Sequence, residues 1–248
     1  MSSLSTDNAW RELHEAATVP YKKGGTFAWQ FARGKLGRDP VFRGLLERGL
    51  IDAQHRRVVD IGCGQGLFVS LLASMSAMQQ QGRWPASWPA TPAAADYTGI
   101  ELMPRDVARA QAALGHLEPA PRILCADMCS APLPACDLVV ILDVLHYVDL
   151  AAQEGVLQRV RDALAPGGRL LLRVGDASSK RGYAISQWVD HTVTRIRGHR
   201  VSPTWGRTLV EWTTLLQRLG FAVQNIPMSQ GTPFANVLLV ADLGPATP

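Results

Sequence analysis

The 248 residues of this chain are 47% hydrophobic and 19% charged, a balance typical of a globular protein and not of a disordered one. No segment approaches the roughly 18 consecutive apolar residues that a membrane-spanning helix requires. The net charge of +4 permits an anionic partner but does not demand one. A chain of this length can bury a large core, and we expect an α/β fold.

The cysteines and the N-terminus indicate the compartment. Cys63, Cys125, Cys129 and Cys136 are too few and too scattered for a disulfide framework, and no histidine or further cysteine pair completes a zinc set. Residues 1–7 lack the basic and apolar blocks of a signal peptide. We therefore expect reduced thiols, a cytoplasmic location, no membrane span and no bound metal.

Residues 1–56 are expected to form a helical segment ahead of the main domain. Apolar residues keep helical spacing over 10–17 and again over 41–50, with a loop at 20–25 between them. Aromatic and basic residues follow this loop: Phe27, Trp29, Phe31, Arg33 and Lys35.

From residue 57 onward, apolar runs typical of strands alternate with helical patterns, which predicts a parallel, doubly wound sheet. The expected strands span 57–61, 96–100, 122–126, 137–142, 169–174, 221–226 and 236–241. The expected helices include 66–78, 104–114, one that ends at Pro166, one around 183–196 and one over 209–219. Two insertions, at 79–95 and 176–207, interrupt this alternation.

The first expected strand ends at Asp60-Ile61 and runs into three glycines at alternate positions, Gly62, Gly64 and Gly66. Glycine has no Cβ, so backbone N–H groups in such a turn can approach a ligand closely. The spacing is G-x-G-x-G, which differs from the dinucleotide fingerprint G-x-G-x-x-G.

Acidic residues follow the next two expected strands. Glu101 closes the second strand and Asp127 follows the third. Ligands of doubly wound sheets bind outside the carboxyl ends of the strands, where an acid after the second strand accepts hydrogen bonds from ribose hydroxyls. The insertion at 79–95 explains why Glu101 lies farther from the glycines than usual. The alternative for Asp127 is a turn or helix-capping residue.

These motifs in this order resemble the class I S-adenosylmethionine-dependent methyltransferases over roughly residues 57–241. Ala165-Pro166-Gly167-Gly168 matches the family's turn before strand five, and Leu219-Gly220-Phe221 its segment before strand six. The resemblance implies a Rossmann-like seven-stranded sheet of order 3-2-1-4-5-7-6, with strand 7 antiparallel. In this arrangement residues 1–56 are an N-terminal helical lid and 57–248 the cofactor-binding core.

The resemblance also implies a cofactor, S-adenosylmethionine, and its product S-adenosylhomocysteine. The glycine turn would hold the methionine moiety, Glu101 the ribose and Asp127 the adenine amino group. The residues implied to bind the cofactor are Asp60, Gly62, Cys63, Gly64, Gly66, Glu101, Leu102, Asp127, Met128 and Leu142.

The segment 142–148 after the fourth expected strand holds the candidate catalytic residues, Asp143 and His146. His146 is the only obvious titratable base at this end of the sheet, and an imidazole suits removal of a proton from a phenol-like hydroxyl. The alternative is a packing role. The segment lacks Asn-Pro-Pro-Tyr, Pro-Cys and a metal-binding Asp-Asn pair, which argues against amide or base N-methylation, pyrimidine C5-methylation and metal-dependent catechol methylation.

Acceptor specificity is expected to come from residues 1–56 and 176–207, where aromatic and basic side chains suit a flat, anionic acceptor or, alternatively, form solvated lid helices. The candidate substrate residues are Tyr21, Trp29, Arg33, Tyr147, Trp188 and His191. Residues 31–42 also resemble, over a short pattern, methyltransferases of bacterial aryl-polyene pigment pathways. That resemblance implies an aromatic acceptor, free or held by an acyl carrier protein.

We therefore expect metal-independent O- or C-methylation of a small aromatic or polyketide-like molecule in bacterial secondary metabolism. The alternatives are an RNA methyltransferase, a non-catalytic S-adenosylmethionine-binding partner subunit and a nicotinamide oxidoreductase. The small charge and the lack of a separate RNA-binding module argue against nucleic acid. The glycine spacing argues against the oxidoreductase. A homodimer is left open.

Overall fold

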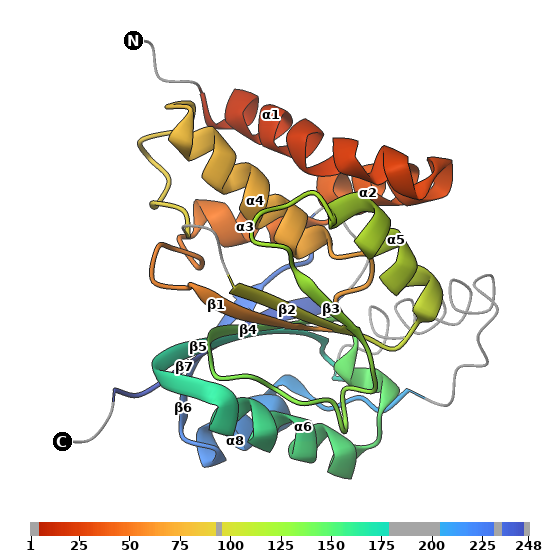
Figure 1. Ribbon diagram of the computed structural model, residues 1–248. Coiled ribbons are helices and arrows are strands. Elements are labelled where there is room, and N and C mark those ends of the chain that lie inside the picture. Colours follow the sequence, from red (N-terminus) through yellow and green to blue (C-terminus); the bar gives the residue numbers. More distant parts are fainter. Residues whose placement is uncertain (1–4, 93–95, 179–203, 231–234, 246–248) are drawn as a thin grey trace. The chain divides into compact units, whose positions relative to one another are not determined.

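The computed structural model describes residues 5–92, 96–178, 204–230 and 235–245 (Figure 1). The chain forms two compact units, Met1–Asp137 and Leu138–Pro248. The division between a lid at 1–56 and a core at 57–248 stays a prediction. No helix in the described part of the chain is both long enough and apolar enough to span a bilayer.

Six helical elements belong to the first unit: α1 (Thr6–Thr18), η1 (Val19–Gly24), α2 (Thr26–Arg38), α3 (Pro40–Glu47), α4 (Leu67–Gln80) and α5 (Pro104–Leu114). Asp39 caps α3, because its carboxylate accepts a hydrogen bond from the Val41 N–H at 3.1 Å. The segment expected as a loop at 20–25 is mostly the 3-10 helix η1. Pro20 suits the first turn of η1, and Gly25, with φ 93°, ends it.

Three parallel strands, β1 (Arg57–Ile61), β2 (Asp96–Glu101) and β3 (Arg122–Cys125), form the sheet of the first unit. In their register Asp60 lies opposite Gly99, and Glu101 lies opposite Cys125. Figure 1 shows α1, α2, α4 and α5 on one side of these strands. The carboxyl ends of β1 and β2 therefore lie at the same edge, where the glycine turn begins.

The second unit contains most of β4 (Cys136–Leu142), then η2 (Leu145–Tyr147), α6 (Leu150–Ala163), β5 (Leu164–Gly175), α8 (Leu209–Arg218), β6 (Phe221–Pro227) and β7 (Asn236–Leu243). Strand β7 is antiparallel to both β5 and β6. The strand order is β3-β2-β1-β4-β5-β7-β6, which confirms the predicted Rossmann-like fold.

Element boundaries differ most at β5, which begins at Leu164 instead of the predicted Arg169. The Pro166-Gly167-Gly168 segment lies within β5, although Gly167 has a φ of 78°, and the Gly167 N–H donates to the Gly244 carbonyl at 3.1 Å. In the insertion predicted at 79–95, α4 extends to Gln80, and Trp88 is buried against Trp84 with ring centroids 4.9 Å apart. The helix predicted around 183–196 lies outside the described residues.

Candidate functional site

The glycine turn joins β1 to α4 and has a backbone that only glycine adopts easily. Gly62, Gly64 and Gly66 have φ values of 74°, 57° and 72°. The turn is tied to the neighbouring strand, because the N–H groups of Gly62 and Cys63 both donate to the Ile100 carbonyl, at 2.8 and 3.1 Å. The turn is thus held at the carboxyl end of β2.

Two of these glycines differ in what surrounds them. A Cβ at Gly66 would lie 2.6 Å from the Leu114 side chain, so this position is required by the packing of α5 on the turn. A Cβ at Gly64 would meet no atom within 4 Å. Gly64 therefore borders open space that a bound group could fill.

Glu101 spans this open side of the turn. Its Oε2 accepts a hydrogen bond from the Gly64 N–H at 2.9 Å, and its Oε1 accepts one from the Met103 N–H at 2.8 Å. Burial raises the pKa of this carboxyl, and the two backbone donors oppose that rise. Each carboxylate oxygen can accept more than one hydrogen bond, so the group is oriented and still able to bind hydroxyls.

Asp60 lies beneath the turn and is buried. The Tyr97 hydroxyl donates to its Oδ2 at 2.6 Å. The pKa of Asp60 is raised to about 7 in total: burial is the largest cause, the Tyr97 hydrogen bond opposes the rise, and the nearby Glu101 charge adds to it. Asp60 thus titrates near neutral pH. Burial also raises the pKa of the nearby Cys63 thiol.

The raised pKa of Asp60 predicts how stability changes with pH. The folded state binds this proton more tightly than the unfolded state, so the free energy of unfolding falls as pH rises from about 4 to about 7. Because the shift runs from 3.8 to about 7, Asp60 contributes at most about 4 kcal/mol to this fall. Asp60→Asn should flatten it. Urea unfolding of both proteins at pH 5 and pH 7.5 measures the difference, and equal pH slopes would contradict the prediction.

Three further buried side chains support the turn from below. The Tyr21 hydroxyl donates to the Gln65 carbonyl at 2.9 Å, and the Gln65 side-chain amide donates to Asp106 at 3.2 Å. Arg109 pairs with the same Asp106 carboxylate at 3.0 Å. Tyr21 is fully buried, and its position supports a role in holding the turn. Sequence reasoning missed Gln65 and Asp106; the only signal for Gln65 was its place between two of the glycines.

Asp127 is exposed just beyond β3. Its Oδ1 accepts a hydrogen bond from the Cys129 N–H at 2.8 Å, which is the geometry of an Asx turn. Leu102, after β2, is 62% exposed, and Met128 is half-buried. The turn-forming role considered for Asp127 is therefore present, and its contact with adenine stays a prediction.

Asp143, in the second unit, follows the half-buried Leu142 at the end of β4 and forms an ion pair with Arg173 of β5. The Arg173 Nε donates to Oδ1 at 2.8 Å, and a second guanidinium nitrogen donates to Oδ2. Arg173 is only 1% exposed, and Asp143 has φ 60°, which is uncommon for a residue other than glycine. Sequence reasoning missed Arg173, because nothing in the apolar pattern of β5 marks a buried cation.

His146 and Tyr147 lie on η2, both half-buried, with ring centroids 4.2 Å apart. The Trp205 N–H donates to the His146 carbonyl at 2.9 Å. Trp205, which precedes α8, is therefore hydrogen-bonded to the backbone of His146, the candidate base.

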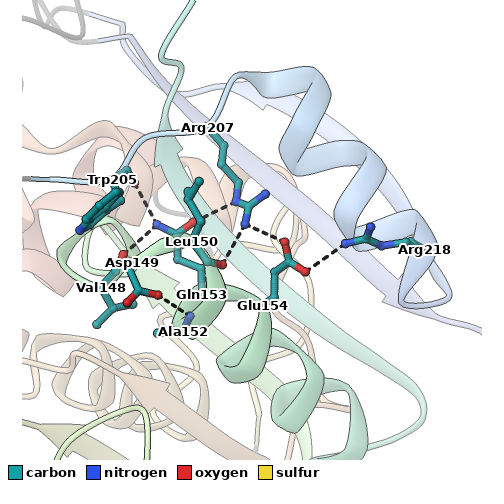
Figure 2. A network of polar contacts seen from close by, with 9 residues as sticks. All are labelled: Val148, Asp149, Leu150, Ala152, Gln153, Glu154, Trp205, Arg207 and Arg218. Atoms are coloured by element: carbon teal, nitrogen blue, oxygen red, sulfur yellow. Dashed lines mark hydrogen bonds and ion pairs between the residues drawn. The ribbon is translucent and has the colours of Figure 1, made fainter.

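A network around Gln153 holds this segment in place (Figure 2). The buried Gln153 amide donates to the carbonyls of Val148 and Trp205, at 3.1 and 2.9 Å, and accepts from the Arg207 Nε at 3.0 Å. Arg207 also pairs with Glu154 at 2.9 Å, as Arg218 does at 3.2 Å. The Gln153 side chain thus joins α6 to residues 205–207 through two hydrogen bonds, and a third ties it to the Val148 carbonyl just before α6.

Of the remaining candidate substrate residues, Trp29 and Arg33 lie on α2, with the Arg33 guanidinium 5.0 Å from the Trp29 ring centroid. Trp188 and His191 lie outside the described residues. Among the residues that the structure describes, no group of three or more His, Cys, Asp or Glu side chains could hold a metal ion.

Residues 32–226 match the model of a protein family described as a methyltransferase domain. This chain belongs to that family. The family match and the strand order confirm the resemblance to class I methyltransferases. The chain is 38% identical over 106 residues to acetylserotonin O-methyltransferase of Mus musculus, a match that covers 42% of this chain and 26% of the mouse enzyme.

Solved structures show the same fold. A mitomycin 7-O-methyltransferase is 21% identical, with a TM-score of 0.55 over 96% of this chain and 68% of the other. A magnesium protoporphyrin IX methyltransferase from Synechocystis, solved with bound S-adenosylhomocysteine (SAH), is 16% identical, with a TM-score of 0.53 over 98% of this chain and 90% of the other.

Proposed function

We propose that this methyltransferase uses S-adenosylmethionine, bound at the carboxyl ends of β1 and β2. The observation that carries the proposal is the Glu101 carboxylate, which the N–H groups of Gly64 and Met103 orient beside the open space at Gly64. An oriented carboxylate after the second strand suits the two hydroxyls of a ribose. The bound product in the Synechocystis structure supports the same cofactor.

The residues present fit this cofactor. The space beside Gly64 is open and could hold part of the cofactor, and a side chain at this position would fill that space. The exposed Asp127 carboxylate can still accept a hydrogen bond from the amino group of the adenine. When bound, S-adenosylmethionine supplies a methyl group already activated by the positive sulfur. The protein then has to position the two reactants in line and exclude water.

We propose a small aromatic or polyketide-like acceptor, methylated on oxygen or carbon without a metal, and either free or held by an acyl carrier protein. The similarity to the acetylserotonin and mitomycin O-methyltransferases supports oxygen as the acceptor atom. In this proposal His146 removes the acceptor proton, and the neighbouring Tyr147 contacts the acceptor ring. We further propose that the protein acts in the cytoplasm and in bacterial secondary metabolism.

Calorimetric titration with SAH tests the cofactor site. We expect micromolar binding, about −8 kcal/mol, and at least a tenfold loss of affinity in Glu101→Ala, because the ribose hydroxyls lose their acceptor. Asp96→Ala is the matched control, since it removes an exposed carboxylate from the other end of the same strand. Absence of binding by the wild-type protein, or equal affinity of Glu101→Ala, would contradict the proposal.

The proposed base is tested with the same protein and a panel of phenolic acceptors. We expect His146→Gln to lower kcat by a factor of about 10² to 10⁴ for a hydroxyl acceptor, without a change in SAH affinity. Mass spectrometry of the products measures the rate. A variant that retains full kcat across pH 6 to 9 would assign His146 a packing role instead.

A further inference from the structure

One surface of the first unit combines exposed apolar side chains with basic ones. It is formed by η1 and α2, and we call it the α2 surface. Its residues are Val19, Lys22, Lys23, Phe27, Trp29, Phe31, Arg33 and Arg38.

The apolar part of the α2 surface is unusually exposed. Phe27 is 54% exposed and Val19 is 44% exposed. Phe27 stacks on Phe31 one helical turn away, with ring centroids 6.4 Å apart. The inner side of α2 is already covered, because Ala28, Ala32 and Leu36 are buried. Phe27 therefore lies on the outer side of the helix, whereas Trp29 and Phe31 are half-buried. Exposed apolar side chains that lie among basic ones can mark an interaction site.

The charge of this surface has one sign. Residues 19–38 contain five basic and no acidic residues, whereas the whole chain has a net charge of +4. Lys35 pairs with Asp39 at 2.7 Å. Within the described ranges, no acidic side chain pairs with the other four, Lys22, Lys23, Arg33 and Arg38. The α2 surface thus attracts anions.

The cations lie over the aromatic faces. The Lys22 ammonium and the Arg33 guanidinium each lie 5.0 Å from the Trp29 ring centroid, and the Arg109 guanidinium lies 4.5 Å from that of Phe27. Nucleic-acid bases bind by stacking on open aromatic faces, and here cations already lie against two of the three rings, Trp29 and Phe27. An aliphatic side chain such as Val19 gives a base nothing to stack on. Rings beside cations on one helix are instead typical of segments that lie in the headgroup region of a bilayer.

We propose that the α2 surface binds the surface of an anionic lipid bilayer, with Phe27 and Val19 inserted between the headgroups. The four cations that have no acidic partner among the described residues would bind lipid phosphates. Such binding is peripheral and reversible, because its apolar area is small and its electrostatic attraction weakens with salt. It would place this methyltransferase where an acceptor dissolved in the membrane surface is concentrated.

Sedimentation of the full chain with vesicles tests the proposal. Vesicles of phosphatidylcholine with 30% phosphatidylglycerol are compared with pure phosphatidylcholine at about 50 mM and 300 mM salt. We expect binding to the anionic vesicles at low salt, weakened about tenfold by Phe27→Ser and about tenfold by Lys22→Gln/Lys23→Gln. The matched controls, Val210→Ser (75% exposed, on α8) and Arg48→Gln/Arg56→Gln, should bind as the wild-type protein does.

Three outcomes would overturn the proposal. One is no sedimentation with anionic vesicles. A second is a loss of binding in the lysine variant without any loss in Phe27→Ser, because binding would then depend on charge attraction alone and not on insertion of Phe27. A third is competition by poly-uridine RNA that depends on Phe27, which would assign the surface to nucleic acid. All substituted side chains are exposed, and circular dichroism with thermal melts confirms that each variant is folded.

Discussion

Asp143→Ala is expected to lower the free energy of unfolding by about 4 kcal/mol. Roughly 3 kcal/mol of this arises because the 1% exposed Arg173 loses the carboxylate that compensates its buried charge. Roughly 1 kcal/mol more arises because alanine disfavours the φ of 60° at this position. Urea unfolding monitored by tryptophan fluorescence measures the change.

Two companion variants separate the charge from the backbone. Asp143→Asn tolerates the positive φ and keeps one acceptor for Arg173, so it should be less destabilised than Asp143→Ala. The double variant Asp143→Ala/Arg173→Met removes the buried charge as well and should recover about 2 kcal/mol relative to Asp143→Ala. If the double variant is less stable than Asp143→Ala, the ion pair is not the source of the effect. A large loss of stability would also assign Asp143 a structural role in addition to any catalytic one.

Gly66→Ala is expected to cost about 3 kcal/mol of stability. The new methyl group would lie 2.6 Å from the Leu114 side chain, which is itself buried and cannot move aside easily. Its φ of 72° adds roughly 1 kcal/mol for any residue with a Cβ. The double variant Gly66→Ala/Leu114→Val should recover part of the packing loss, and thermal unfolding measures both.

Gly64→Ala is the matched control, and its effect should fall on binding instead. Its φ of 57° carries a similar backbone cost, but no atom lies within 4 Å of the added Cβ. The methyl group would occupy the open space beside the N–H that donates to Glu101, so we expect at least a tenfold loss of SAH affinity with only about 1 kcal/mol of stability lost. Equal losses of stability in Gly64→Ala and Gly66→Ala would mean that the turn tolerates no side chain at all.

The sequence by itself determined the fold class and pointed to the edge of the sheet at which we propose the cofactor site. Alternating strands and helices follow from hydrophobic periodicity, and the three glycines of residues 62–66 mark a turn that only glycine adopts easily. These are local signals, since each depends only on residues that are close together in the sequence. The position of Glu101 at the end of β2 follows from the same local pattern. The antiparallel direction of β7 was implied by the family resemblance alone.

Only the tertiary structure decided which polar groups meet. The pairs Asp60–Tyr97 and Gln65–Asp106 join residues 37 and 41 positions apart, and Asp143–Arg173 joins residues 30 apart. A sequence pattern shows that a residue is polar but not which partner satisfies it. A buried polar group, however, is stable only with its partner in place. For that reason the raised pKa of Asp60, the ion pair that holds Asp143 and the hydrogen bonds of Gln153 all required the folded chain.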